Sequence, residues 1–296
     1  MRLLTFHTST DLKLGIKTER GIIDVAAAQE AFHTELAAIT IPTSFEELCS
    51  GEAVDLEGLK QLVAVTKEKH GAWLLHEEQI QFGPSASHAG KIICVGLNYR
   101  RHAAESNMPV PESPVLFPKY ANTLAGSGEE IPLPANATQY DYEAELALVI
   151  SRRARYVSED QALNYVLGYC NGHDLSARDL QFRTSQWMLG KTVDKFLPIG
   201  PYLVTADEAG DPQNQSIKLW LNGELRQNSH TGDMIFSVAY IISYLSQYIT
   251  LEPGDTIVTG TPEGVISGHP EFPWLKAGDE VTIEVGNLGR LTNILR

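Results

Sequence analysis

The chain has few cysteines, and its amino terminus lacks the apolar core of a signal peptide. Its three cysteines, Cys49, Cys94 and Cys170, are an odd number without the spacing of a zinc site. A disulfide-stabilised secreted fold and a structural zinc site are therefore both disfavoured. These features together predict a protein of the reducing cytoplasm.

Basic residues are also scarce. The chain has 23 lysines and arginines against 37 aspartates and glutamates, for a formal net charge of −14. Such an excess of negative charge opposes general binding to nucleic acids or to anionic membranes. It leaves room for a small anionic ligand in a local basic pocket, so we expect a small-molecule partner and neither nucleic acid nor membrane.

No segment reads as a membrane span. The longest apolar run, residues 234–251, is interrupted by serine, glutamine and threonine and is stopped by Glu252-Pro253-Gly254. Asp233 precedes it as an expected N-cap. The pattern favours a buried core helix over a bilayer crossing.

Composition and turn signals predict two domains and an α+β, mainly β fold. With 43% hydrophobic and 20% charged residues in a chain of 296, there is enough material for a large globular domain and a smaller one. The polar segment 83–90 has the composition of a linker, which predicts a small N-terminal domain over residues 1–83 and a catalytic domain over residues 84–296. Expected strands are residues 3–7, 12–18, 22–25, 91–96, 216–221, 256–259 and 280–285, and expected helices are residues 26–32, 44–48 and 56–66.

Two acidic residues stand at the head of an apolar, strand-like segment, residues 141–150. Because side chains alternate along a strand, Glu143 and Glu145 point to one face, roughly 7 Å apart. Like charges persist in a buried place only by taking up a proton or by sharing a cation, so the pair predicts a site for a hard divalent metal. An edge strand whose acids face water is the more common arrangement for such a pair taken alone.

Further polar residues follow along the chain, and each of them alone is less informative than the acidic pair. Asp174 comes after a strand-like piece and, alone, reads as the N-cap of a helix beginning at Leu175. Lys191 lies in an apolar, glycine-rich setting, where a surface lysine is the ordinary alternative. The glycines of residues 259–265 allow backbone amides to approach a ligand, although a plain hairpin has a similar sequence.

Taken in order, these motifs resemble the fumarylacetoacetate hydrolase family, in particular bacterial members of this length, some of which are oxaloacetate decarboxylases. The resemblance implies a mixed β-sandwich or roll as C-terminal domain with a small α+β N-terminal domain. The matching segments span residues 91 to about 293 and comprise Gly96-Leu97-Asn98-Tyr99 with His102, residues 141–146 and 174–181, Gly190-Lys191 with Asp194, and residues 222–227 and 259–262.

The resemblance implies that Glu143, Glu145 and Asp174 bind Mg²⁺ or Mn²⁺. Three carboxylates without cysteine or histidine ligands agree with a hard cation. A 2-oxo acid would chelate that ion through its carboxylate and keto oxygens, and the ion would hold the negative charge of the resulting enolate. Lys191 would place a second positive charge against the same oxygens.

His102 and Glu105 match a pair that family members place on a mobile segment over the metal, where it activates water. If the segment is helical, residues three apart share a face, so Glu105 can orient the imidazole as a general base. A solvated helix with an unremarkable histidine is the alternative. The resemblance also assigns substrate contacts to Lys119, Gln181, Gln227 and Thr261.

One residue near the expected site has a weak claim to a role, and two others depart from the family pattern. Arg178 has a weak claim to a role because an arginine beside Asp179 is more often a structural ion pair. His173 stands where the family commonly has asparagine, and Ile266 where a glycine is common. His173 would alter the hydrogen bonding behind Asp174 or add a titrating group, with effects on pH optimum and substrate choice.

The sequence thus predicts a metal-dependent enzyme acting on a small 2-oxo acid through a metal-bound enolate, with decarboxylation of oxaloacetate as the first expectation. Hydrolysis of an acylpyruvate or a fumarylacetoacetate-type diketone, and isomerisation or tautomerisation of a 2-oxo dioic acid, use the same enolate and remain open. A catalytically silent binding protein is the alternative of another class. The resemblance further implies a homodimer formed through the C-terminal domain, with the apolar helix at residues 234–251 available for it.

Overall fold

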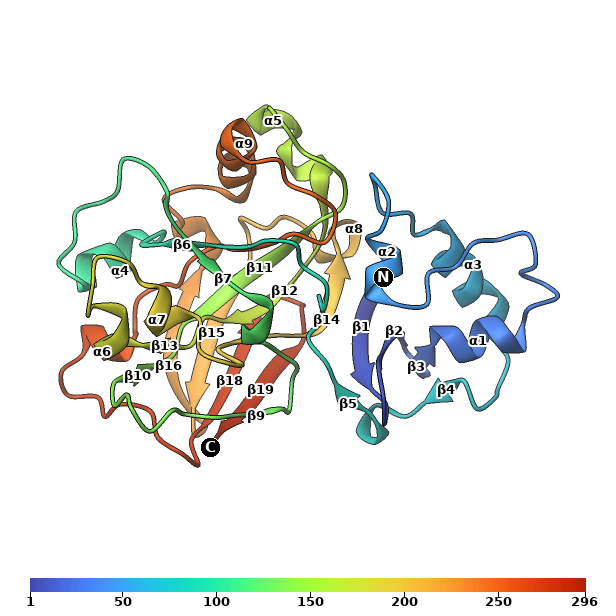
Figure 1. The fold of residues 1–296 in the computed structure, drawn as a ribbon, viewed down its shortest axis with the longest axis horizontal. Helices are drawn as coiled ribbons and strands as arrows, with labels where there is room; N and C mark the ends of the chain where they lie inside the picture. Colours follow the sequence, from blue (N-terminus) through green and yellow to red (C-terminus); the bar gives the residue numbers. More distant parts are fainter.

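The computed structural model describes all 296 residues, which fold around one large mixed sheet with a smaller sheet beside it (Figure 1). Strands hold more of the chain than helices do, so the predicted α+β, mainly β class is confirmed. The main path of the large sheet runs in the order β4 (Leu74–Leu75), β3 (Gly21–Asp24), β2 (Leu12–Thr18), β1 (Arg2–His7), β14 (Leu197–Thr205), β12 (Val166–His173), β11 (Ala144–Ile150), β17 (Thr256–Val258), β6 (Ile92–Gly96) and β7 (Val115–Lys119).

Four short strands and a second sheet complete the β-structure. β5 (Gln81–Phe82) pairs with β1, β8 (Leu124–Ala125) pairs with β14, and β10 (Tyr140–Asp141) pairs with β13 (Ser176–Ala177). The second sheet has the order β16 (Glu224–His230), β15 (Ser216–Leu221), β18 (Glu280–Val285), β19 (Arg290–Leu295) and β9 (Glu130–Ile131).

The helices are short and lie around the sheets. In the N-terminal part they are α1 (Val25–Ala31), α2 (Phe45–Leu48) and α3 (Glu57–Thr66). The rest of the chain has α4 (Arg100–Glu105), α5 (Glu159–Ala162), α6 (Arg178–Gln181), α7 (Met188–Lys191), α8 (Ala206–Ala209) and α9 (Val238–Tyr248). In Figure 1, α4, α6 and α7 gather at the end of the molecule opposite the N-terminal part.

The N-terminal strands extend the large sheet. β1 pairs antiparallel with β14, in the register of Arg2 with Val204 and Leu3 with Leu203, so the sheet passes without a break from residues 1–83 into the rest of the chain (Figure 1). Residues 83–91 between β5 and β6 form neither helix nor strand. The domain boundary in this segment stays a prediction.

The longest helix begins later than the sequence predicted. α9 starts at Val238, and Ser237 is its N-cap because the Ser237 hydroxyl accepts a hydrogen bond from the Tyr240 amide at 3.0 Å. Asp233 lies four residues before Ser237, in a 3₁₀ turn, so the prediction that Asp233 is the N-cap was wrong. None of the helices combines the length and the apolar character that a membrane crossing requires.

Candidate metal centre

Glu145 lies on β11, an interior strand of the large sheet, and Glu143 directly precedes this strand. β11 pairs with β12 on one side and β17 on the other, so the alternative of a solvated edge strand is wrong. Glu143 is 5% exposed and Glu145 is 2% exposed. The buried side chains of β11 alternate between two core clusters, with Leu146 in one and Ala147 in the other. The prediction that Glu143 and Glu145 point to one face depended on this alternation.

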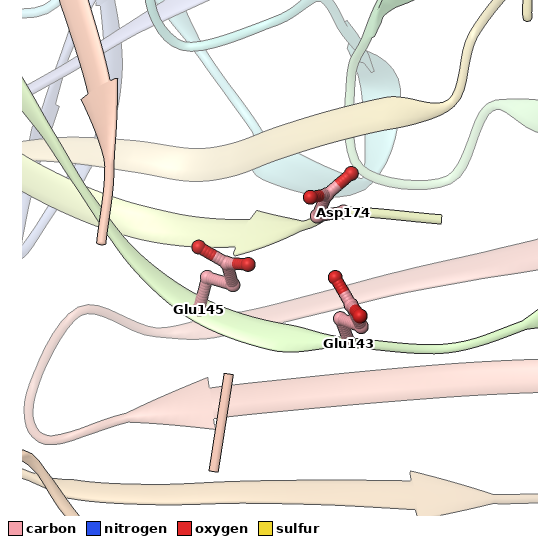
Figure 2. Close-up of side chains that lie close together, drawn as sticks. All are labelled: Glu143, Glu145 and Asp174. Atoms are coloured by element: carbon pink, nitrogen blue, oxygen red, sulfur yellow. The ribbon is translucent and has the colours of Figure 1, made fainter. Parts of the chain in front are cut away.

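Asp174 joins the pair because of strand register. It follows β12 directly, and its amide donates to the Glu143 carbonyl at 3.1 Å where β11 and β12 separate. No helix begins at Leu175, since β13 follows there, so reading Asp174 as an N-cap was wrong. Each of the three carboxylates offers an oxygen within 4.8 Å of the others, close enough to share one cation (Figure 2).

Lys191 is the buried counter-charge of this group. It ends α7, is 2% exposed, and places Nζ 2.6 Å from Glu143 Oε2 and 2.8 Å from Asp174 Oδ2. Burial opposes the charge of Lys191, but Asp174 and Glu143 outweigh it and raise its pKa. Lys191 is therefore a fixed cation inside the site, which excludes the alternative of a surface lysine.

Arg178 belongs to the same charge network. Its guanidinium donates to Asp141 Oδ2 at 2.9 Å, to Glu143 Oε1 at 2.7 Å and to Gln181 Oε1 at 2.9 Å. It does not pair with Asp179, whose Oδ2 instead accepts a backbone hydrogen bond at 2.9 Å, so that expectation was wrong. Arg178 and Gln181 are three residues apart on α6, and this helical spacing is the sequence signal that the two side chains lie together.

Asp141 is a further residue that the sequence reasoning did not place in the site. Besides Arg178, its oxygens accept the amides of Ile266 at 2.7 Å and Ser267 at 3.0 Å. Its position two residues before Glu143, on the same face of an extended segment, was the available signal. Asp141 thereby ties the loop after Thr261 to the acidic strand.

The charges of the site leave one carboxylate without a cation. Burial raises the pKa of Glu143, but Lys191 and Arg178 outweigh it and hold that pKa at about 2. Burial and the neighbouring Asp174 and Glu143 charges raise the pKa of Glu145 well above its usual range. Glu145 Oε2 accepts a hydrogen bond from the Gly260 amide at 2.5 Å. A divalent cation would supply the missing positive charge, so the residues present fit Mg²⁺ or Mn²⁺.

A second buried lysine lies against Asp174. Lys119 Nζ lies 2.7 Å from Asp174 Oδ1 and donates to the carbonyls of Lys191 and Phe196 at 2.5 and 2.8 Å. Lys119 therefore offsets the charge of Asp174, and Glu145 is the one of the three carboxylates that has no ion-pair partner.

A cavity of about 250 Å³ opens onto this group. Of the residues predicted to contact substrate, Gln181 and Thr261 line it, whereas Lys119 and Gln227 do not. Gln227 lies behind the wall, where it accepts the Ala144 amide at 2.9 Å and donates to Thr261 Oγ1 at 2.9 Å. The other lining residues include His102, Glu143, Glu145, Arg178 and Lys191 on the polar side and Leu97, Met108, Phe117, Phe182 and Trp187 on the apolar side.

His102 and Glu105 form a pair on α4, as their spacing predicted. His102 Nδ1 lies 3.3 Å from Glu105 Oε2, and the imidazole lines the cavity. Burial raises the pKa of Glu105, but hydrogen bonds from His102 and from the Gly264 amide outweigh it, so the pKa is lowered. Glu105 is thus an anion able to support a protonated His102. His269, which no sequence signal marked, also contacts Glu105, at 2.8 Å.

The two residues that depart from the family pattern are both buried. Burial lowers the pKa of His173 to about 3 against the opposing effect of Asp174, so His173 stays neutral and adds no group that titrates near pH 7. Its Nε2 has no hydrogen-bond partner. Ile266 is 2% exposed and packs into the core while its amide binds Asp141.

Comparison with known proteins places these observations in one family. The family model described as fumarylacetoacetate (FAA) hydrolase C-terminal matches residues 91–296. A protein of Xenopus laevis named oxaloacetate tautomerase fahd2, mitochondrial, is 37% identical over 299 residues, covering 99% of this chain and 89% of its own. The 2,4-didehydro-3-deoxy-L-rhamnonate hydrolase of Sphingomonas sp. (strain SKA58) is 46% identical over 217 residues, covering 73% of this chain and 76% of its own.

A solved structure adds a bound metal to the comparison. The maleylpyruvate hydrolase of Sphingobium sp. SYK-6, in complex with manganese(II) ion and pyruvate, is 27% identical to the chain. The two superpose with a TM-score of 0.78 over 100% of this chain and 98% of the hydrolase chain.

Proposed function

Because the chain belongs to the fumarylacetoacetate hydrolase family, we propose that it is a divalent-metal-dependent enzyme that acts on a small 2-oxo acid. The observation that carries the proposal is the buried group of Glu143, Glu145 and Asp174, in which Glu145 has no cation partner and from which Glu143 and Glu145 line a cavity. Mg²⁺ or Mn²⁺ would be held by these three side chains. When bound, the ion would stabilise negative charge on the 2-oxo oxygen of the substrate.

The protein's own residues supply the remaining parts of the reaction. Lys191 presents a fixed positive charge beside the carboxylates, where charge develops on the substrate oxygens. Gln181 and Thr261 line the cavity and orient the substrate. His102, supported by Glu105, accepts and returns a proton at the edge of the cavity. Phe117 and Trp187 exclude water from one wall.

The first candidate reaction uses oxaloacetate, which either loses carbon dioxide or changes between its keto and enol forms. Both reactions require that the negative charge on the 2-oxo oxygen be stabilised. Lys191 supplies a positive charge for this. The name of the Xenopus relative, a tautomerase of oxaloacetate, supports this substrate.

The second candidate is hydrolysis of a carbon–carbon bond in an acylpyruvate. It is favoured by His102 and Glu105, because water must lose a proton to attack the acyl carbonyl, whereas decarboxylation needs no activated water. The manganese and pyruvate in the maleylpyruvate hydrolase structure support this reaction class as well.

The proposal is tested by a product assay over a panel of 2-oxo acids, with Mn²⁺ and with a chelator. Oxaloacetate, its enol form and acylpyruvates of increasing chain length form the panel. We expect at least one to be converted with Mn²⁺ and none in chelator. Conversion of none under either condition would contradict the enzymatic proposal and favour a binding protein.

We expect Glu105→Gln to separate the two candidate reactions. The substitution keeps the shape of the side chain but removes the charge that supports a protonated His102, so hydrolysis should fall by about 10²-fold or more. Decarboxylation should fall less. Both rates are measured at saturating Mn²⁺, with Glu112→Gln, an exposed glutamate beyond the end of α4, as the control. Equal losses in both reactions would contradict the assignment of the pair as a water-activating base.

We also propose that the chain forms a homodimer through its C-terminal domain. The apolar face of α9 is buried within the chain, but Tyr240 and Tyr244 are half-buried and Tyr248 is exposed, and the three rings follow one another with centroids 6.0 and 5.3 Å apart. Aromatic side chains of this kind are common at protein interfaces. Light scattering at micromolar concentration should give twice the chain mass, and Tyr248→Glu, at a position 70% exposed, should reduce it. A monomeric wild-type mass would refute the dimer.

The place of the enzyme in the cell remains a prediction. The sequence predicts the cytoplasm, and the Xenopus relative is named as mitochondrial.

A further inference from the structure

The loop of residues 264–269 surrounds the carboxylate of Glu105. Oε1 accepts the Gly264 amide at 2.8 Å and lies 2.8 Å from His269 Nε2, while Oε2 faces His102 at 3.3 Å. A Cβ on Gly268 would come within 2.5 Å of Glu105 Cδ, so only glycine allows the loop to approach this closely. Both oxygens of Glu105 are therefore occupied, one by α4 and the other by residues 264–269.

The ring of His269 is fixed on its other sides. Its Nδ1 lies 3.1 Å from Glu271 Oε1, and the ring stacks on Phe272 with centroids 4.7 Å apart and planes at 27°. Phe272 is in turn covered by the Arg226 guanidinium, 4.4 Å from the ring centroid. His269 thus presents Nε2 to Glu105 in a defined orientation although its side chain is 35% exposed.

We propose that His269 is a positioning residue that holds Glu105 and, through it, His102 against the cavity. The contacts form a continuous row from Glu271 through His269 and Glu105 to His102. α4 has only six residues, and a helix this short is not stable by itself. The contact from His269 therefore fixes the distance between α4 and the loop that also binds Asp141.

An ordinary surface ion pair is the competing explanation, and such pairs contribute little. Two observations oppose it. The Glu105 side chain is only 11% exposed, so its contacts are less screened than those of a surface pair. The same carboxylate also binds His102, which lines the cavity, so a displacement of Glu105 is passed directly to the imidazole.

The inference rests on the proposed function insofar as His102 and Glu105 act as the base, and a double-mutant cycle tests that step. His269→Leu removes the contact between Nε2 and Glu105 and keeps the bulk, so kcat for the reaction that is sensitive to Glu105→Gln should fall about 10-fold with little change in KM. His269→Gln, which keeps a polar side chain, should recover most of the loss. In the Glu105→Gln background, His269→Leu should cause no further loss, because its effect passes through Glu105.

A second measurement needs neither metal nor turnover. Hydrogen–deuterium exchange of residues 98–106 in the metal-free protein should be faster in His269→Leu than in wild type. His33→Leu, at an exposed histidine of the N-terminal part whose side-chain contacts stay within residues 30–34, is the control and should change neither exchange nor kcat.

The outcomes separate this inference from the proposed function. A wild-type protein that converts no 2-oxo acid contradicts the function, and the exchange measurement then still tests the contact. An equal loss of kcat from His269→Leu with and without Glu105→Gln, or unchanged exchange of residues 98–106, overturns the positioning role. Faster exchange, together with a loss of kcat that occurs only when Glu105 is intact, supports the positioning role.

Discussion

Glu145→Gln is expected to abolish metal binding without weakening the metal-free fold. Burial and two neighbouring carboxylates already raise the pKa of Glu145, so a neutral side chain relieves repulsion when no metal is bound. Wild-type protein at a Mn²⁺ concentration 100-fold above its Kd should gain about 2.7 kcal/mol of stability. The variant should gain almost none and should lose activity. Scanning calorimetry with Mn²⁺ and with chelator measures the stability of the metal-free protein and the gain on adding Mn²⁺. The product assay over the 2-oxo acid panel measures activity.

The other two ligands give a matched contrast. Glu143→Gln and Asp174→Asn should also lose the Mn²⁺ effect, but each removes a charge that pairs with the buried Lys191. Breaking a buried pair costs about 3–5 kcal/mol, so these variants should be destabilised where Glu145→Gln is not. Glu68→Gln, at an exposed position, is the control. Full activity and a full Mn²⁺ shift in all three variants would exclude the metal site.

Lys191→Met is expected to reduce every reaction of the enzyme by about 10²–10³-fold, in the range found when one group that stabilises an oxyanion is removed. Methionine has a similar length but no charge. Negative charge develops on the 2-oxo oxygen in decarboxylation, tautomerisation and hydrolysis alike, so the losses should be similar across the 2-oxo acid panel. The measurement is kcat for each substrate at saturating Mn²⁺.

This substitution should destabilise the metal-free protein, because it breaks two buried ion pairs, but the carboxylates keep other partners. Glu143 retains Arg178 at 2.7 Å, and Asp174 retains Lys119 at 2.7 Å. The Mn²⁺-induced shift in stability should therefore persist in Lys191→Met, which separates loss of chemistry from loss of metal. Lys276→Met, at a lysine whose side chain is 73% exposed, is the control. Wild-type kcat for any substrate would contradict a role of Lys191 in charge stabilisation.

Local patterns predicted the elements that depend on short-range rules. Strand alternation placed Glu143 and Glu145 on one face, and the spacing of His102 and Glu105 placed both on one side of α4. The start of α9 was missed because aspartate and serine are almost equally good caps, and only the observed backbone path shows that Ser237 has this role. Likewise, only register shows that Asp174 adjoins Glu143 instead of capping a helix.

The role of charged residues was harder to predict, because their partners lie far along the chain. Arg178 next to Asp179 suggests a local pair, yet its guanidinium binds Asp141 and Glu143, some 35 residues earlier. His269 meets Glu105 across more than 160 positions, and no periodicity connects them. Such contacts depend on loop paths, which local propensity does not encode.

The sequence by itself determined the fold class, the family resemblance and the presence of three carboxylates suited to a hard cation, because these follow from composition, alternation and motif order. The tertiary structure decided which charges share one buried volume. The interior position of β11 buries the acidic pair and leaves Glu145 without a cation partner, and the loop around Glu105 brings His269 next to it. Electrostatic effects depend on distance and burial in space, and these are set by strand register and loop packing rather than by separation along the chain.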